Sequence, residues 1–288
     1  MILICGATGR VGTALIRELR VAGARLRCLV RDLDRARALL GADVELACGN
    51  FDSAAGLDAA LRGVQQFFVM SPVGPEMATQ QERAARAAVR ARVERIVKLS
   101  GSSWTMQPNN MTSTGAAHAQ VEAVIERSGV AHTFVRPNVF MQGMLGRIPG
   151  QIAQDDSFGL AIGAAGAAFI DINDIAAVAA RALLAEQTLG PVLDITGPQA
   201  CSGDDIARIA SAVAGRPVSY RPLQIDAALA GPRAAGESDW MQRHLSEVWT
   251  LMMQGAAAAT TDVVPAICHR PAGSVEPWLR RALAPTQS

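Results

Sequence analysis

The sequence predicts an α/β fold in which a doubly wound parallel sheet carries helices on both faces. Three observations lead to this prediction. Short apolar runs alternate with amphipathic stretches through the first half of the chain, each run is bounded by Gly, Pro, Asn or Ser, and a glycine turn joins the first run to the first amphipathic stretch. Strict alternation of strands and helices indicates βαβ units, whose strands are parallel and whose crossovers are right-handed.

The first half is expected to contribute most of the sheet. The segments that read as strands are ILICGA, RLRCLV, VELACGN, QQFFVMSP, RIVKLSG and HTFVRP. The expected helices lie between them, at residues 11–22, 33–40, 54–61, 77–92 and 116–128. In each helix the apolar residues recur at the spacing of one helical face, which packs on the sheet.

The pattern loosens after Pro137. Residues 141–168 are rich in Gly and Ala and carry few strand signals, so we expect a loop or lid near the carboxyl edge of the sheet. The segment FIDINDIAAVAARALL then predicts a short strand followed by a helix capped by Asp171 or Asn173.

A second helix signal follows at Ser202. Ser202 and Asp205 have the spacing of a capping box, and Gly215 is placed to end that helix. Residues 225–288 read as helices interrupted by prolines.

The composition excludes several classes of protein. In 288 residues, Lys+Arg number 27 against 26 Asp+Glu without a basic stripe, so nucleic acid is not an expected partner. No apolar run approaches the roughly 20 residues of a membrane span, and the opening MILIC does not resemble a signal peptide, so a cytoplasmic location is expected. The five cysteines and four histidines lack metal-ligand spacing, so no metal is expected.

The glycine turn ICGATGRVG carries the first functional signal. Gly6 permits the tight turn, Gly9 lets the backbone approach a pyrophosphate, and Gly12 lets helix and strand pack closely. The first helical turn adds unpaired N–H groups and a positive dipole end. The sequence therefore assigns the turn to a dinucleotide in a Rossmann arrangement, with a turn that binds nothing as the alternative; the residues concerned are Gly6, Thr8, Gly9, Arg10, Val11 and Gly12.

Arg31 favours NADP(H) over NAD(H), although NAD(H) stays open. It stands at the tip of the second expected strand, about twenty residues after the turn, where an acidic residue would bind the ribose 2′-hydroxyl of NAD. An arginine there pairs with the 2′-phosphate of NADP, and Arg10 can add a second charge. Asp32 is adjacent, and a plain surface arginine is the alternative.

These motifs, taken together with others downstream, resemble the NmrA-like branch of the atypical short-chain dehydrogenase/reductases. The resemblance runs from Met1 to about Tyr220; its segments are GNFDSAAGL, KLSGSS, HAQVEAVIERSGVAHTFVRPNVFMQGML, FIDINDIAAVAARAL and LDITGPQACSGDDIARIASAVAGRPVSY. It implies a Rossmann core in residues 1–140, completed by strand and helix segments in 168–196. Residues 141–167 and 197–288 are then a small, mostly helical C-terminal substrate lobe.

The resemblance also implies further cofactor contacts. It puts Asn50, Phe51 and Asp52 beside the adenine, and Met70, Ser71 and Pro72 along the nicotinamide ribose. The segment from Pro137 to Phe140 would border the nicotinamide and the substrate. Ordinary loop or core packing is the alternative for each of these residues.

The resemblance fails at the proton donor. Reductases of the broader superfamily usually carry Tyr-x-x-x-Lys on the helix after the fifth strand, and four residues further on they often carry a glutamate. Aligning Glu122 with that glutamate puts Thr114 at the tyrosine position and His118 at the lysine position. The only tyrosine, Tyr220, and the only lysine, Lys98, are not four residues apart and do not lie on that helix.

Three candidates for the catalytic groups remain. Ser102, at the family's catalytic serine position, can donate a hydrogen bond to a developing oxyanion, and Thr114 can do the same. His118 can orient the cofactor ribose or donate a proton, and a histidine satisfied by a neighbour is its alternative.

We therefore expect an NADPH-dependent reductase of a small hydrophobic carbonyl compound, an aryl ketone or a quinone. The substrate's own hydroxyl, with the pKa of a phenol near about 10, would supply the proton. A non-catalytic protein that senses NADP and NADPH is the alternative, and monomer and homodimer stay open. Apolar residues of the C-terminal part would line the pocket unless they form the core; they are Met141, Met144, Leu145, Phe158, Trp240, Met241, Trp249, Leu251, Met252 and Met253.

Overall fold

The computed structural model describes residues 1–284 and divides into two compact units. The first unit consists of Met1–Gly101, Thr114–Arg136 and Ile172–Asp194. The second consists of Ser102–Ser113, Pro137–Asp171 and, of the described residues, 195–284.

A seven-stranded sheet with strand order β3-β2-β1-β4-β5-β6-β8 forms the centre of the fold. The strands are β1 (Ile2–Ile4), β2 (Leu26–Val30), β3 (Glu45–Cys48), β4 (Gln66–Val69), β5 (Arg95–Leu99), β6 (Ala131–Pro137) and β8 (Val192–Ile195). The first six pair in parallel. β8 runs with β6, because the N–H groups of Phe134 and Asn138 donate to the carbonyls of Pro191 and Ile195 in the same chain order. The predicted parallel sheet is confirmed.

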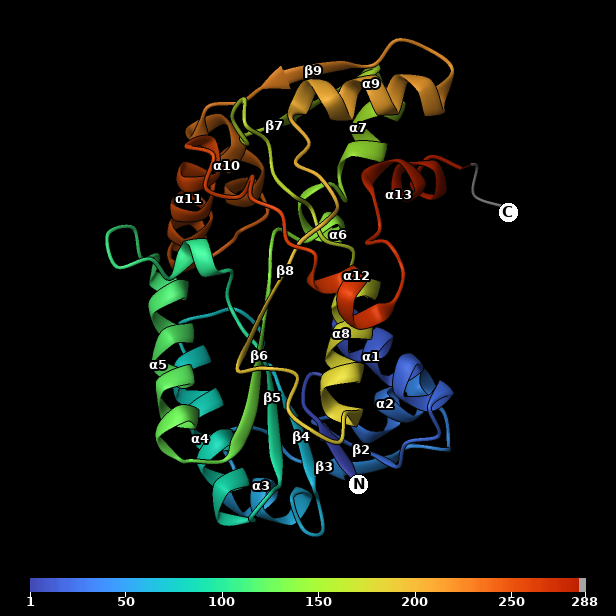
Figure 1. Ribbon diagram of the computed structural model, residues 1–288. Coiled ribbons are helices and arrows are strands. Elements are labelled where there is room, and N and C mark those ends of the chain that lie inside the picture. Colours follow the sequence, from blue (N-terminus) through green and yellow to red (C-terminus); the bar gives the residue numbers. More distant parts are fainter. Residues whose placement is uncertain (285–288) are drawn as a thin grey trace. The chain divides into compact units, whose positions relative to one another are not determined.

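Helices cover both faces of this sheet. They are α1 (Arg10–Val21), α2 (Leu33–Leu40), α3 (Ala54–Ala60), α4 (Met77–Arg90), α5 (Ser113–Arg127) and α8 (Ile172–Leu184). Figure 1 shows α3, α4 and α5 on one side and α1, α2 and α8 on the other. The fold is therefore doubly wound, as predicted, and the expected helix ends agree to within a few residues.

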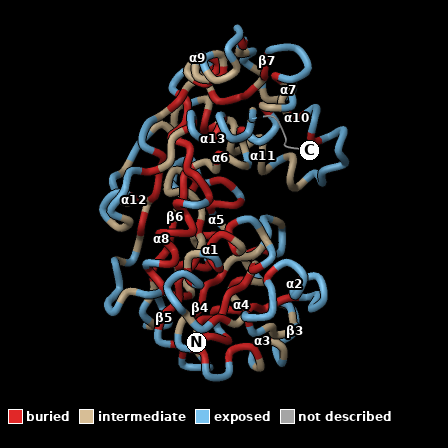
Figure 2. Tube along the Cα trace, turned by 90° about the vertical axis from the view of Figure 1, so that its right-hand side faces the viewer, coloured by how far each residue is buried: buried red, intermediate tan, exposed pale blue. Residues whose placement is uncertain are grey.

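Alternation along β5 sorts its side chains between the two faces. Ile96 packs in the apolar cluster that also holds Val121 and Ile125 of α5. On the other face, the guanidinium of Arg95 donates to the carbonyls of Ala182 and Ala185 at the end of α8, at 3.1 and 2.6 Å. Successive residues of a strand point to opposite faces, so Lys98 shares the α5 face with Ile96. Figure 2 shows β4, β5 and β6 mostly in the colour of buried residues, although β6 begins at the exposed Ala131.

The expectation of a loop or lid at residues 141–168 is wrong. The segment contains α6 (Met141–Met144), α7 (Ile148–Asp155) and β7 (Ser157–Leu160), and β7 pairs in parallel with β9 (Ser219–Pro222). Met141, Leu145, Ile152 and Phe158 lie in the core of the second unit. The glycines and alanines between these side chains hid the periodicity, although the elements themselves are short and well packed.

The predicted capping box is confirmed, but the prolines expected to interrupt the helices after residue 225 lie mostly within them, as Pro232 does. Residues 285–288 of that stretch lie outside the described part of the chain. α9 (Gly203–Ala214) begins with the predicted capping box of Ser202 and Asp205 and ends at Gly215, whose φ is +69°. α10 (Ile225–Ala234), α11 (Asp239–Met253), α12 (Val263–Cys268) and α13 (Val275–Ala282) follow, and a short 3-10 helix, η1, spans Ser103–Thr105. The strand expected before α8 is a single bridge between Phe140 and Ile170.

Within residues 1–284, no helix combines the length and the apolar character that a membrane crossing requires.

Candidate functional site

The glycine turn between β1 and α1 has the geometry that the sequence predicted. Gly6 has a φ of +67°, and a Cβ there would lie 2.6 Å from Cε of Met70. A Cβ on Gly12 would lie 2.1 Å from the carbonyl oxygen of Gly6. Gly12 must be glycine because its Cβ would meet backbone atoms that cannot move aside, whereas Gly6 is required by its positive φ, since the flexible Met70 side chain can move.

The N-terminus of α1 offers a site for an anion. Gly9 is the N-cap, it provides no side-chain cap, and the first turn of the helix contains no acidic residue. The N–H groups of this turn and the helix dipole therefore present positive potential without an internal carboxylate to neutralise it. Thr8 and Arg10 are exposed beside the turn, whereas Val11 is buried beneath it.

Arg31 and Asp32 have different tasks in the structure. The carboxylate of Asp32 caps α2 by accepting a hydrogen bond from the N–H of Arg35 at 2.9 Å. Arg31 follows directly after β2, is exposed, and forms no ion pair with any residue in the described part of the chain. Asp32, whose carboxylate could have indicated NAD, is thus occupied in capping α2, and the guanidinium of Arg31 is available to a phosphate.

The loop after β3 is held by Asn50. Its side-chain oxygen accepts hydrogen bonds from the N–H groups of Asp52 and Ser53, at 2.9 and 3.0 Å. Asp52 pairs with Arg83 of α4 at 2.8 Å. Phe51 is half-buried against the apolar cluster of the first unit. Asn50 thus shapes this loop through hydrogen bonds to the backbone within the loop itself.

Met70 and Ser71 continue from β4 towards the glycine turn. The methyl group of Met70 lies over Gly6 and close to Gly9, so the structure brings these three predicted residues together. The hydroxyl of Ser71 accepts a hydrogen bond from the side-chain amide of Gln81 at 3.0 Å. The amide of Gln81 is buried in α4, which fixes the position of the Ser71 hydroxyl.

The three α5 positions taken from the family pattern share one buried face. Thr114, His118 and Glu122 are spaced by four residues and are exposed by 7, 8 and 4%. This spacing places side chains one above the other along a helix. The alignment of Glu122 with the glutamate of the family pattern is consistent with a single buried face that holds all three side chains.

Lys98, the lysine that does not lie on the helix of the family pattern, lies beside His118. Its Nζ is 2.7 Å from Nδ1 of His118 and 3.3 Å from the hydroxyl of Ser100, and the residue is completely buried. Burial lowers the pKa of Lys98 to about 7; Glu122 opposes this effect and Arg136 adds to it. Strand periodicity could have predicted this contact, because a buried lysine in an apolar strand needs a polar partner on the helix that covers its face of the sheet.

Ser100, Glu122 and Arg136 complete this buried polar cluster. The Ser100 hydroxyl donates to Oε1 of Glu122 at 2.5 Å. Arg136 donates from Nε to the same oxygen at 3.0 Å and from Nη2 to the other oxygen. A continuous chain of polar contacts therefore runs from His118 through Lys98, Ser100 and Glu122 to Arg136, all within the first unit.

Ser102 and Pro137 lie in the second unit, whereas Thr114 and His118 lie in the first. The hydroxyl of Ser102 donates to the carbonyl oxygen of Pro137 at 2.6 Å. Its proton is therefore engaged by the backbone, and the hydroxyl must rotate to donate to a substrate oxygen.

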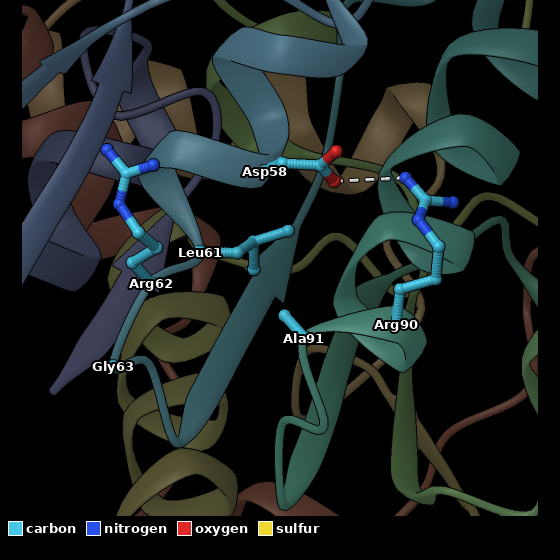
Figure 3. Close-up of a pocket in the computed structure, with 6 residues that line it drawn as sticks. All are labelled: Asp58, Leu61, Arg62, Gly63, Arg90 and Ala91. Atoms are coloured by element: carbon cyan, nitrogen blue, oxygen red, sulfur yellow. Dashed lines mark hydrogen bonds and ion pairs between the residues drawn. The ribbon is translucent and has the colours of Figure 1, made fainter.

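A surface hollow of the first unit has a different location from the nucleotide turn. Figure 3 shows its lining, in which Asp58 of α3 and Arg90 of α4 form an ion pair of 3.0 Å. Gly63 and Ala91 precede β4 and β5, so the hollow lies where strands begin. Nucleotides in this type of sheet bind at the carboxyl ends of the strands, so the hollow is not part of the candidate site.

The strand order, the two helical layers and the glycine turn define the Rossmann class of α/β folds. The profile of the NmrA-like family matches residues 1–236, and the chain belongs to this family.

Two relatives are similar over nearly their whole length. The NAD(P)H azoreductase of Xenophilus azovorans is 33% identical over 272 residues, which are 94% of each chain. The (4-alkanoyl-5-oxo-2,5-dihydrofuran-3-yl)methyl phosphate reductase of Streptomyces griseus is 33% identical over 280 residues, 96% of each chain. Both are reductases by name.

A solved structure with the same fold is the NADPH-dependent quinone oxidoreductase of Escherichia coli complexed with NADPH. It has a TM-score of 0.86 and 23% identity, and the match covers 98% of this chain and 99% of that one.

Proposed function

We propose that this protein is an NADPH-dependent reductase of a small, flat, hydrophobic acceptor such as a quinone or an aryl ketone. One observation carries the proposal: the glycine turn leads into a helix N-terminus without a side-chain cap, and an exposed arginine without an ion pair in residues 1–284 follows the next strand. Similarity to two reductases over nearly the full chain supports the oxidoreductase class.

The residues fit the cofactor. Gly9 lets the backbone of the turn approach a pyrophosphate, Gly6 and Gly12 allow the tight packing of turn and helix, and α1 contributes N–H groups. Arg31 would hold the 2′-phosphate of the adenosine ribose, which distinguishes NADPH from NADH. Asn50, Phe51, Met70, Ser71 and Pro137 would border the rest of the cofactor. When bound, NADPH supplies the hydride.

The protein must stabilise the charge that develops on the substrate oxygen and deliver a proton. We assign hydrogen-bond donation to the hydroxyls of Ser102 and Thr114. His118 would orient the ribose or donate the proton. A phenolic hydroxyl on the substrate, placed next to its carbonyl, would provide a further proton donor.

The second unit is proposed as the substrate lobe, with two hollows of about 430 and 280 Å³. Leu251 lines the larger with Trp104, and Met253 lines the smaller with Tyr220. Met141, Leu145, Phe158 and Met252 are completely buried and form the core of this unit instead.

Turnover with a panel of acceptors tests the proposal. Purified protein is mixed with NADPH and with benzoquinones, naphthoquinones, hydroxyaryl ketones and an azo dye, and the loss of absorbance of the reduced nicotinamide is followed. Consumption that depends on protein and acceptor supports the reductase. Tight binding of both NADP and NADPH without consumption would instead identify a nucleotide-sensing protein, the alternative that the absent Tyr-x-x-x-Lys pair favours.

A further inference from the structure

The Lys98–His118 contact restricts where protons can lie. Nitrogen atoms 2.7 Å apart form a hydrogen bond only if one donates and the other offers a lone pair. The ammonium of Lys98 has donors only, so a charged Lys98 makes Nδ1 of His118 the acceptor. Nε2 then carries the proton of the neutral imidazole. In the other arrangement an imidazolium donates from Nδ1 to a neutral amine.

Both arrangements carry one positive charge. An imidazolium beside an ammonium at this distance would place two like charges in a site that excludes water, and it would leave no lone pair for the hydrogen bond. At every pH at which the pair is charged, Lys98 and His118 therefore share a single positive charge, carried by one proton that lies on either residue.

The groups around the pair favour that single charge. Glu122 lies one helical turn from His118 on α5 and favours a charged Lys98, whereas Arg136 on β6 disfavours it. Ser100 donates to Glu122 and also lies within hydrogen-bond distance of Lys98. On the neighbouring strand, β4, the residue opposite Lys98 is the apolar Val69.

We propose that Lys98 is a positioning residue that acts through His118: it holds the imidazole with Nδ1 as acceptor and Nε2 as the protonated atom, and it replaces the proton that Nε2 gives up. This inference rests on the proposed reductase function for its catalytic consequence, but the proton arrangement is a property of the protein alone.

The transfer balances in protons and charge. As the N–H bond at Nε2 breaks and the proton joins the substrate oxyanion, one N–H bond of the Lys98 ammonium breaks and a bond to Nδ1 forms. Lys98 becomes neutral, His118 stays neutral with the other tautomer, and the oxyanion loses its charge. After product release, a proton from water at Nε2 and the return of the Nδ1 proton to Lys98 restore the pair.

Nitrogen NMR of histidine-labelled protein tests the arrangement without any substrate. The chain has four histidines, and the signals missing in His118→Asn identify those of His118. In the wild type we expect an unprotonated Nδ1 and a protonated Nε2 near neutral pH. In Lys98→Met the fixed tautomer is lost, and His118 takes up a proton at higher pH because a neighbouring cation has gone.

His132 provides the internal control. It belongs to the same unit, and its Nδ1 lies 2.9 Å from the carbonyl oxygen of Val130. Its signals should be the same in wild type and Lys98→Met. A wild-type His118 protonated at Nδ1, or a His118 spectrum unchanged by Lys98→Met, overturns the proposal.

Kinetics test the catalytic consequence. Loss of a group that orients a metal-bound imidazole typically costs about 10- to 100-fold, and we expect a loss of the same size for an imidazole that donates a proton. Lys98→Met should therefore lower kcat by this factor and leave the KM for NADPH unchanged. The double variant Lys98→Met/His118→Asn should be no slower than His118→Asn alone. Multiplicative losses would contradict action through His118.

Glu122→Gln keeps the proposal testable should Lys98→Met fail to fold. Because the Glu122 carboxylate favours the charged lysine, its removal should make the pair lose its shared proton at a lower pH. The His118 signals report the midpoint of that loss. No movement of that midpoint contradicts the inference. A wild type with the expected NMR signals but without turnover on any acceptor contradicts the reductase function and leaves the proton arrangement standing.

Discussion

A Cβ on Gly12 would lie 2.1 Å from the carbonyl oxygen of Gly6, so β1, the turn and α1 are packed backbone against backbone. Gly12→Ala should therefore force the turn open. Overpacking of this kind costs about 1–3 kcal/mol of stability, and the displaced N–H groups should weaken NADPH binding by about tenfold or more. Calorimetric titration and thermal unfolding measure the two effects.

Gly150→Ala is the matched control. Gly150 lies in α7, and a Cβ there would meet nothing within 4 Å. This variant should bind NADPH like the wild type and be at least as stable, because alanine favours a helix by about 1 kcal/mol over glycine. A Gly12→Ala protein with wild-type affinity would show that the turn does not contact the nucleotide.

Arg31→Ala should reduce the preference for NADPH over NADH. A hydrogen bond to a charged group is worth about 1.5–3 kcal/mol, so the Kd for NADPH should rise by about 10- to 100-fold, whereas the Kd for NADH should not change. Arg62→Ala is the control, because Arg62 lines the hollow at the opposite end of the strands. Equal losses for both nucleotides would contradict the assignment of Arg31 to the 2′-phosphate.

Ser102→Ala should lower kcat and leave NADPH affinity unchanged. Removal of an oxyanion donor typically costs about 10²- to 10³-fold, but the Ser102 hydroxyl must first leave the Pro137 carbonyl. We therefore expect a loss near the lower end of that range. Steady-state kinetics with a quinone measure it, and an unchanged kcat would limit Ser102 to a structural bond with Pro137.

Stability should depend on pH through Lys98. Burial lowers the pKa of Lys98 to about 7, whereas a lysine in the unfolded chain titrates near about 10.4. Between these values the unfolded chain binds more protons, so this group makes the protein more stable as the pH rises. Below pH 7 the folded state bears the full cost of the buried charge.

Lys98→Met removes that dependence. Its stability advantage over the wild type should be largest at and below pH 7 and should shrink as the pH rises towards 10. Burial also raises the pKa values of Cys5 and Cys28, but both thiols are present in both proteins and their contributions cancel. Urea unfolding at several pH values measures the difference, and a difference that does not vary with pH contradicts a charged, buried Lys98.

Much of the fold could be predicted because its signals are local. Apolar runs and helical periodicity located the six strands and five helices of the first half, and the Ser202 capping box located α9. The prediction for residues 141–168 was wrong because the helices and the strand in this segment are short. Only the tertiary contacts of Phe158 and Met141 show that the segment belongs to a core.

The geometry of the glycine turn was also predictable, since Gly6 adopts a positive φ and Gly12 packs on the carbonyl oxygen of Gly6, six residues earlier in the sequence. The place of Lys98 in the site was not predictable, because the family pattern has its lysine four residues after the tyrosine on the same helix. In the structure, the lysine beside His118 comes instead from β5, which α5 covers, and is 20 residues away in sequence.

The central claim is that the turn at Gly6–Gly12 and Arg31 bind NADPH, and calorimetric titration of the wild type with NADPH tests it most directly. The account predicts saturable binding to one site per chain, tighter for NADPH than for NADH, with the preference reduced in Arg31→Ala. The absence of binding at millimolar nucleotide would contradict it.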